Sequence, residues 1–363
     1  MIEGVQEIFA RMADELSRKI YIDRLNYSIT QNNSYIDGMV EQAVRSRESW
    51  RDFCRHLKER AADGLYLYGA GVWGKTLYEE TQNLLVWQGI IDSQADKRKI
   101  FGTKVIHPEA FAAEYDKNAS VVISSHKYGR EMEKTLRGLG VSPDKILNGG
   151  KVIYRLTEGA AYFDLEALLP LRSYEVFIDG GAFDGATTLE FMKWCDGNGY
   201  AFCFEADSKN IATAAAHLSG IENCEIVHKA LWSKNTSLYI DMKGNCSSTV
   251  SEEKRGENIE IIETAALDDV VGDRPVTYIK MDIEGAELEA LQGAENIIRK
   301  QHPRLAVSIY HKPEDIWTIP RLLMKYYEGY WFYMRHYSFS WYDTVLYAIP
   351  QEPVINPYPT MNR

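Results

Sequence analysis

The sequence has few cysteines, no long apolar run and no basic stripe, and each of these absences excludes a class of protein. Its five cysteines include no C-x-x-C pair, which favours reduced thiols in the cytoplasm. No apolar run approaches the ~20 residues that a membrane helix needs, and the acidic N-terminus is unlike a secretory signal. A net charge of -11 without a basic stripe argues against nucleic acid as the main partner. We therefore expect a cytoplasmic protein with no membrane span and a small-molecule partner.

A glycine-rich segment at residues 176–189 carries the strongest functional signal. Its first residues are apolar and predict a buried parallel strand, which Asp179 closes at the edge where open α/β sheets bind ligands. Gly180 and Gly181 allow a tight turn and a close backbone approach, and Gly185 allows the next helix to pack on its strand. The segment therefore predicts a loop that cradles a nucleotide.

The side chains around this loop favour a nucleoside without a diphosphate. Phe183 occupies the position at which a middle glycine would admit a pyrophosphate, and Glu205 ends the next predicted strand, where it can accept two hydrogen bonds from a ribose. S-adenosylmethionine fits, with its amino-acid end at the loop, its ribose at Glu205 and its adenine over the following strand and turn. The expected cofactor-binding residues are Asp179, Gly180, Gly181, Phe183, Asp184, Gly185, Glu205, Ala206, Ala230 and Leu231. The alternative is an ordinary glycine-rich turn with an exposed glutamate.

Two later strands are predicted to deliver polar side chains to the same sheet edge. The strand at residues 276–282 ends in Asp282, with Glu284 close behind and a helix predicted at residues 286–298. The strand at residues 305–310 leads into His311, the expected general base, because the ordinary histidine pKa of about 6.5 suits proton transfer near neutrality. Asp282 and Glu284 are expected to orient the acceptor or accept its proton; alternatively, they cap and support the following helix.

The acceptor is expected to meet residues near that edge and in the loop of a terminal hairpin, whose strands are predicted at residues 330–334 and 344–349. The candidate acceptor-binding residues are Lys280, Tyr310, Lys312, His336, Tyr337 and Trp341. Asp282, Glu284 and His311 could converge on a divalent ion, but they lack the tight ligand spacing of a metal motif. We therefore expect no metal.

Several segments of the second half together resemble FkbM-type methyltransferases. They are FIDGGAFDGATT, CFEAD, HKALWS, SSTVSEE, ALDDV, IKMDIEGAELEALQGA and LAVSIYHKPEDIW, spread over roughly residues 171–350. The resemblance implies a class I methyltransferase fold, S-adenosylmethionine as donor, and O-methylation of a sugar, a polyketide or a similar small metabolite. One departure is Phe183, where the family often has a polar residue, and it affects how the methionine carboxylate would be held.

The first half contains a separate glycine signal. A predicted strand at residues 65–68 leads into the G-x-G-x-x-G pattern of Gly69, Gly71 and Gly74, and Asp92 ends the next predicted strand. The pattern predicts a small Rossmann-like domain, which resembles the nucleotide-binding-like domains beside sugar-modifying enzymes of polysaccharide biosynthesis. Either the loop binds a nucleotide or nucleotide sugar, or the domain only shapes the fold or presents the substrate.

Taken together, the patterns predict an α/β chain with two Rossmann-like domains, the second with a seven-stranded, mostly parallel sheet that ends in an antiparallel hairpin. The expected divisions are a helical extension at residues 1–60, the small domain at residues 61–155 and the methyltransferase domain at residues 156–363. The extension has an apolar stripe that would either cap a sheet or join two copies in a homo-oligomer.

Two other functions remain open at this stage. An NAD-dependent enzyme acting on a nucleotide sugar would use the first glycine loop, but the Y-x-x-x-K pattern from Tyr239 to Lys243 lies in the wrong half of the chain. A non-catalytic scaffold would have no need for the intact Asp179 and Glu205. Methyl transfer is therefore the expected activity.

Overall fold

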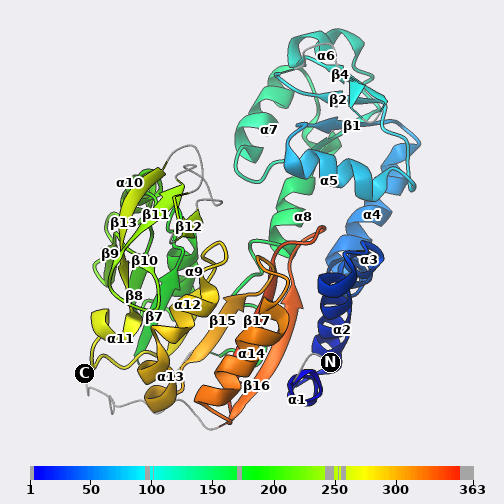
Figure 1. Cartoon of the computed structure of the whole chain (residues 1–363). Helices are drawn as coiled ribbons and strands as arrows, with labels where there is room; N and C mark the ends of the chain where they lie inside the picture. The colour runs from blue at the N-terminus through cyan, green and yellow to red at the C-terminus, as the bar shows by residue number, and fades with distance from the viewer. Residues whose placement is uncertain are drawn as a thin grey trace. The chain divides into compact units, whose positions relative to one another are not determined.

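The chain divides into two compact units (Figure 1). The computed structural model describes residues 4–94, 99–100, 102–169, 174–241, 249–251, 253–254 and 259–351. The larger unit comprises Met1–Met39, Tyr162–His336 and Ser340–Arg363, and the smaller unit comprises Val40–Ala161 and Tyr337–Phe339. Among the described residues, no helix is both long and apolar enough to cross a membrane.

The larger unit is built on a seven-stranded mixed sheet. Its strands are β7 (Glu175–Gly180), β8 (Gly199–Phe204), β9 (Cys224–Val227), β14 (Tyr278–Met281), β15 (Arg304–Ser308), β16 (Tyr330–His336) and β17 (Thr344–Pro350). They lie in the order β16-β17-β15-β14-β7-β8-β9, in which β17 pairs antiparallel with both β16 and β15 and the other pairs are parallel. The strand order reverses between β7 and β14, which is where an open parallel sheet forms a ligand crevice.

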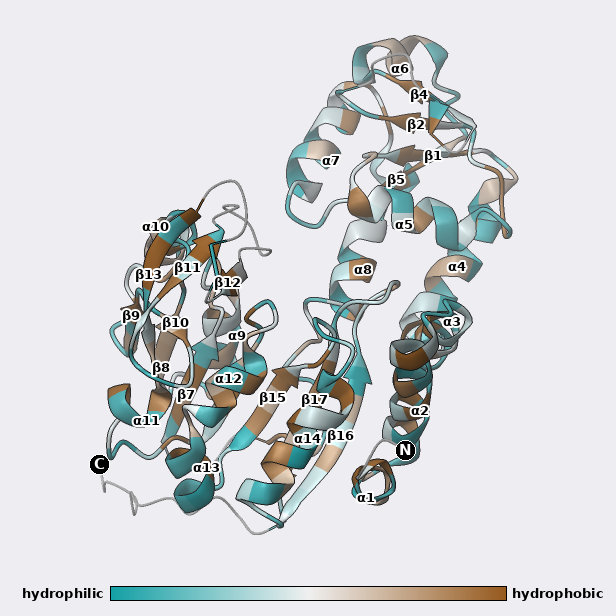
Figure 2. Cartoon of the chain, in the orientation of Figure 1, coloured by the Kyte–Doolittle hydropathy of each residue, from teal (hydrophilic) through white to brown (hydrophobic). Residues whose placement is uncertain are grey.

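Burial on both faces explains the nearly continuous apolar runs of these strands. Figure 2 shows hydrophobic residues along much of β8 and β15, and all five residues of β15 are buried. Phe177 of β7 stacks on Phe191, with ring centroids 4.5 Å apart, so the glycine turn begins from a tightly packed strand.

Six helices connect or follow these strands in the larger unit. They are α9 (Ala186–Trp194), α10 (Ser208–His217), α11 (Leu267–Val270), α12 (Glu287–Gln292), α13 (Glu295–Gln301) and α14 (Asp315–Tyr326). The single helix predicted at residues 286–298 is therefore two helices, α12 and α13. The break lies at Gly293, where the backbone approaches Trp232 so closely that a Cβ would overlap its carbonyl oxygen.

A second, smaller sheet in the larger unit lies in the order β10-β13-β11-β12. Its strands are β10 (Ala230–Leu231), β11 (Ser237–Asp241), β12 (Thr249–Ser251) and β13 (Ile259–Ala265). Ala230 and Leu231, two of the expected cofactor-binding residues, form β10 and pair in parallel with β13. The segment SSTVSEE is only partly within the described residues.

The smaller unit contains a six-stranded sheet in the order β3-β4-β2-β1-β5-β6. The strands are β1 (Leu65–Tyr68), β2 (Gly89–Ile91), β3 (Lys99–Ile100), β4 (Thr103–Ile106), β5 (Ser120–Ile123) and β6 (Ile146–Asn148). Its helices are α4 (Glu48–Ala61), α5 (Val72–Thr81), α6 (Pro108–Glu114), α7 (Gly129–Gly138) and α8 (Gly149–Leu156), with a π-helix at Glu41–Arg45 and a 3-10 helix at Pro143–Lys145. Tyr66, Ile91, Phe111, Ile123 and Leu136 form much of its core.

The N-terminal helices α1 (Val5–Ala10) and α2 (Glu15–Thr30) pack on the larger unit, whereas α3 (Ser34–Val40) ends at the boundary between the units. The short link between α1 and α2 pairs with the edge strand β16, since Phe332 N–H donates to Arg11 O at 3.0 Å and Ala13 N–H donates to Phe332 O at 2.8 Å. Residues 1–60 thus do not form one extension, because the exposed edge of β16 binds their first part. Ile8 and Met12 of the predicted apolar stripe are buried within the chain itself.

Candidate functional site

The turn after β7 adopts a backbone that glycine suits. Gly181 has a φ of +75°, and a Cβ there would overlap the carbonyl oxygen of Asp282. Phe183 also has a positive φ, of 48°, and its side chain is 38% exposed. The turn therefore passes directly beside the chain that follows β14, and it leaves the Phe183 ring accessible to a ligand.

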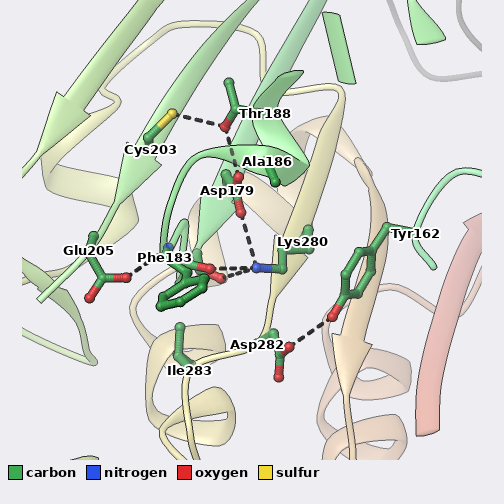
Figure 3. A network of polar contacts seen from close by, with 12 residues as sticks. Tyr162, Asp179, Phe183, Ala186, Thr188, Cys203, Glu205, Lys280, Asp282 and Ile283 are labelled. Carbon is green, nitrogen blue, oxygen red and sulfur yellow. Dashed lines mark hydrogen bonds and ion pairs between the residues drawn. The ribbon is translucent and has the colours of Figure 1, made fainter. Parts of the chain in front are cut away.

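Lys280 of β14 holds this turn in place (Figure 3). Its ammonium group is buried and donates to Asp179 Oδ1 at 3.1 Å, to Gly180 O at 3.0 Å and to Gly181 O at 2.7 Å. Thr188 Oγ1 donates to the other oxygen of Asp179 at 2.8 Å. Lys280 was expected to meet the acceptor, but its three donors are directed into the glycine turn, because the sheet register places it beside Asp179.

Glu205 reaches back from the end of β8 to the same turn. Its Oε2 accepts from Phe183 N–H at 2.9 Å, and its Oε1 accepts from Asp207 N–H at 2.8 Å. Burial raises the pKa of Glu205 despite these hydrogen bonds and the nearby charge of Lys280. Asn210 Nδ2 also donates to Oε1, at 3.4 Å, so Oε2 is the oxygen that keeps a second lone pair and can accept from a ribose hydroxyl.

The remaining expected cofactor-binding residues surround the turn. A Cβ on Gly180 would come within 2.8 Å of the Leu231 side chain, so these two residues are in close contact. Ala206 packs in a hydrophobic cluster with Ala230. Asp184 Oδ1 accepts from the first N–H of α9 at 3.1 Å. The structure therefore brings the end of β8, the start of β10 and the glycine turn together.

Asp282, at the end of β14, lies on the other side of the turn. Its Oδ2 accepts from Tyr162 OH at 2.9 Å and its Oδ1 accepts from Tyr310 OH at 3.2 Å. Burial would raise the pKa of Asp282, but the charges of Lys280 and His311 outweigh it and lower the pKa. Asp282 is thus an ionised carboxylate with two phenol donors.

His311, which follows β15, faces three carboxylates. Its Nε2 lies 3.7 Å from Asp282 Oδ1 and 3.5 Å from Glu284 Oε2, and its Nδ1 lies 3.0 Å from Glu287 Oε1. Glu287, the first residue of α12, was not among the expected site residues. The sequence feature that could have identified Glu287 is its position in the D-I-E-G-A-E segment that also contains Asp282 and Glu284.

The carboxylates change the expected chemistry of His311. Burial by itself would lower the pKa of the imidazole, but Glu284, Glu287 and Asp282 outweigh it and raise the pKa to about 11. At neutral pH the ring is therefore an imidazolium, which has no lone pair to accept a proton. The expected near-neutral pKa is wrong for this arrangement, because the sequence did not reveal how many carboxylates converge on the ring.

The expected acceptor-binding residues do not all gather at this cluster. Tyr310 and Trp341 lie near each other, with ring centroids 6.2 Å apart, and Trp341 is 47% exposed. Lys312 Nζ lies 3.6 Å from Glu289 Oε2. His336 and Tyr337, by contrast, are buried, and Tyr337 belongs to the smaller unit. They were expected in the loop of the hairpin, but β16 extends to His336, and both side chains are buried.

The glycine loop of the smaller unit is held by residues that follow the neighbouring strands, and Ser124 Oγ donates to Gly69 O at 3.1 Å. Gly69 has a φ of +102°, and a Cβ on Gly74 would overlap its carbonyl oxygen. Asp92 Oδ2 accepts from Ala70 N–H at 2.7 Å and Oδ1 accepts from Gln94 N–H at 2.8 Å. These contacts involve both carboxylate oxygens of Asp92, whereas Gly71 has open space around its Cβ position.

Comparison with known proteins identifies the larger unit. Residues 179–340 match the family model described as the methyltransferase FkbM domain. The protein is therefore a methyltransferase. Its second half is, more specifically, an FkbM methyltransferase domain, as the sequence resemblance predicts. No curated protein matched the chain.

Several solved structures show a remote similarity. A methyltransferase FkbM from Methylobacillus flagellatus KT has 16% identity over 89% of this chain and 100% of that chain, with a TM-score of 0.46. A SAM-dependent methyltransferase from Aquifex aeolicus has 13% identity over 60% of this chain and 97% of that chain, with a TM-score of 0.32. Fibrillarin from Aeropyrum pernix, solved with natively bound S-adenosyl-L-methionine, has 8% identity over 54% of this chain and 73% of that chain, with a TM-score of 0.35.

Proposed function

We propose that the larger unit transfers a methyl group from S-adenosylmethionine to a hydroxyl of a small acceptor such as a sugar or glycan precursor. One observation carries the proposal: the Glu205 carboxylate is hydrogen-bonded to the glycine turn and accepts from Phe183 N–H at 2.9 Å. This contact places a hydrogen-bond acceptor for the ribose directly beside the turn, which itself closely approaches the backbone of Asp282. The donor would have its ribose at Glu205 and its amino-acid end at the turn.

The acceptor would lie at the other end of this crevice. Asp282 and His311 follow the adjacent parallel strands β14 and β15, so they lie at the same sheet edge as Asp179 of β7. Tyr310 and the exposed Trp341 offer aromatic surface beside them, of the kind that a sugar face can contact. The donor and acceptor subsites are thereby formed by different strands.

The reaction needs little more than correct positioning. The acceptor oxygen attacks the methyl carbon in line with the sulfur, the C–S bond breaks, and S-adenosylhomocysteine leaves. Asp282 and Glu284 would orient the acceptor hydroxyl, and its proton would pass to one of these carboxylates or to water. His311, as an imidazolium, would balance the charge of these carboxylates and would not take the proton itself.

Calorimetric titration with S-adenosylhomocysteine tests the donor site. Glu205→Ala removes the ribose acceptor, and the loss of a charged hydrogen-bond partner is expected to cost about 1.5 to 3 kcal/mol of binding free energy, or roughly 10- to 150-fold in Kd. Glu225→Ala, which removes an exposed carboxylate from the adjacent strand β9, is the matched control and should bind normally.

A second variant separates the two subsites. His311→Gln should leave the affinity for S-adenosylhomocysteine within about twofold of wild type, since the donor is expected beyond the glycine turn. If Glu205→Ala binds as tightly as wild type while folded, the assignment of the ribose to the end of β8 is wrong.

A further inference from the structure

We propose that Asp282, Glu287 and His311 bind a divalent transition-metal ion. One possible ligand atom from each residue lies within 4.8 Å of the other two. The residues come from three separate elements: the end of β14, the first turn of α12 and the segment after β15. Two carboxylates and an imidazole are a ligand set that first-row divalent ions accept.

The second observation is that two of these side chains are buried and each has a polar atom without a hydrogen-bond partner. Glu287 is fully buried; its Oε1 accepts from Ile283 N–H at 2.9 Å, whereas its Oε2 makes no hydrogen bond. The His311 side chain is 9% exposed, and neither ring nitrogen meets hydrogen-bond geometry. A buried polar atom without a hydrogen bond is costly, and a cation between these groups would reduce that cost.

The charge around the cluster also favours a cation. Even when protonated, His311 supplies one positive charge against the carboxylates of Asp282, Glu284 and Glu287. The other buried cation nearby, Lys280, is directed to Asp179. A divalent ion that displaces the imidazole proton would bring the cluster closer to neutrality.

The kind of ion follows from the donor atoms. Calcium prefers six to eight oxygen ligands, and magnesium is usually held through carboxylates and water. An imidazole among the ligands instead suits Fe²⁺ or Zn²⁺, and the two carboxylates also suit Mn²⁺. Three protein ligands would leave positions open for another oxygen.

The role of the ion rests on the proposed methyl transfer. An acceptor hydroxyl that takes an open position would have its pKa lowered and lose its proton to water. Its oxygen would then form the bond to the methyl carbon as the C–S bond breaks.

Titration of the full chain with Co²⁺, followed by visible absorption after removal of metals with a chelator, tests the site. We expect one Co²⁺ per chain in the wild type. Glu287→Gln and His311→Gln should each weaken binding at least tenfold, since each removes one ligand. Glu289→Gln changes a carboxylate on the same helix outside the cluster and should bind Co²⁺ as the wild type does.

The outcomes separate this proposal from the proposed function. Absence of Co²⁺ binding up to millimolar concentration by folded protein, or wild-type affinity in both ligand variants, overturns the metal site. Because S-adenosylhomocysteine binding is measured independently, its loss alone overturns the donor assignment and leaves the metal site standing. Circular dichroism of each variant shows whether it is folded.

Discussion

Lys280 and Asp179 form an ion pair that is almost completely excluded from water, with side chains 3% and 0% exposed. Such a pair is a weak source of stability, yet removing one partner leaves an isolated buried charge. Here the cation also satisfies the carbonyl groups of Gly180 and Gly181. The pair therefore acts mainly to fix the backbone of the glycine turn.

We expect Lys280→Met to lower the free energy of unfolding by about 3 to 5 kcal/mol, because Asp179 would remain buried and charged. The double variant Asp179→Asn/Lys280→Met removes that charge and keeps an acceptor for Thr188, so it should recover part of the loss. Urea unfolding measures both. Equal losses in the single and double variants would show that the charge of Asp179 is not the cause.

At the scale of elements, α2 is joined to β16 through its N-terminal cap. Asp14 Oδ1 accepts from Ser17 N–H at 2.7 Å, and Arg335 Nη2 of β16 lies 2.6 Å from Asp14 Oδ2. Burial raises the pKa of Asp14, but the hydrogen bonds from Arg335 and Ser17 outweigh it, and the net pKa is lowered. A lowered pKa in the folded state means that the ionised cap stabilises the protein.

The cap is expected to depend on pH in a defined direction. Asp14→Ala should cost about 1 kcal/mol at neutral pH, because both the cap and the ion pair are lost, whereas Asp14→Asn keeps a capping oxygen and should cost less. Since the folded pKa lies below the unfolded one, the stabilisation by the charge is full above the unfolded pKa of 3.8 and is lost as the pH falls through the folded value. Urea unfolding of Asp14→Asn and wild type between about pH 7 and pH 3 should therefore show the difference shrinking in acid. A constant difference would contradict the role of the charge.

The glycine loop of the smaller unit shows how a nucleotide-binding pattern can serve the fold. Asp92, the residue that would bind a ribose in a dinucleotide site, accepts from Ala70 N–H and Gln94 N–H and so holds the backbone on both sides. Gly74 is needed because its backbone approaches Gly69 too closely for a side chain. We infer that this loop shapes the turn between β1 and α5.

At the scale of the whole molecule, the two units each have their own sheet and core. We expect two thermal unfolding transitions. Saturating S-adenosylhomocysteine should raise the midpoint temperature of the larger unit only, because ligand at 100 times its Kd adds about 2.7 kcal/mol to the free energy of unfolding. Gly74→Ala should lower the midpoint temperature of the smaller unit only, and NAD should raise neither midpoint temperature. Differential scanning calorimetry measures these shifts. A single transition moved by both ligand and variant would contradict independent units, and a shift with NAD would contradict a purely structural loop.

Much of the sheet was predictable from local sequence. The apolar runs predicted at residues 176–178, 276–282, 305–310, 330–334 and 344–349 correspond to β7, β14, β15, β16 and β17. These strands are largely buried, so hydrophobicity and β-propensity act in the same direction. The division of residues 1–60 between the two units was not predictable. It depends on which strand is left at the edge of the larger sheet, because the first of these residues pair with that strand.

The positions of the expected site residues were also partly predictable from the local sequence. The sequence by itself determined which residues follow the strands, since a glycine turn, Glu205, Asp282 and His311 must then lie at one sheet edge. Only the tertiary structure decided which of these side chains meet. The strand register paired Lys280 with Asp179 and removed it from the acceptor, and α12 brought the buried Glu287 to His311. Electrostatic environment depends on distances across the fold, which the order of residues along the chain does not specify.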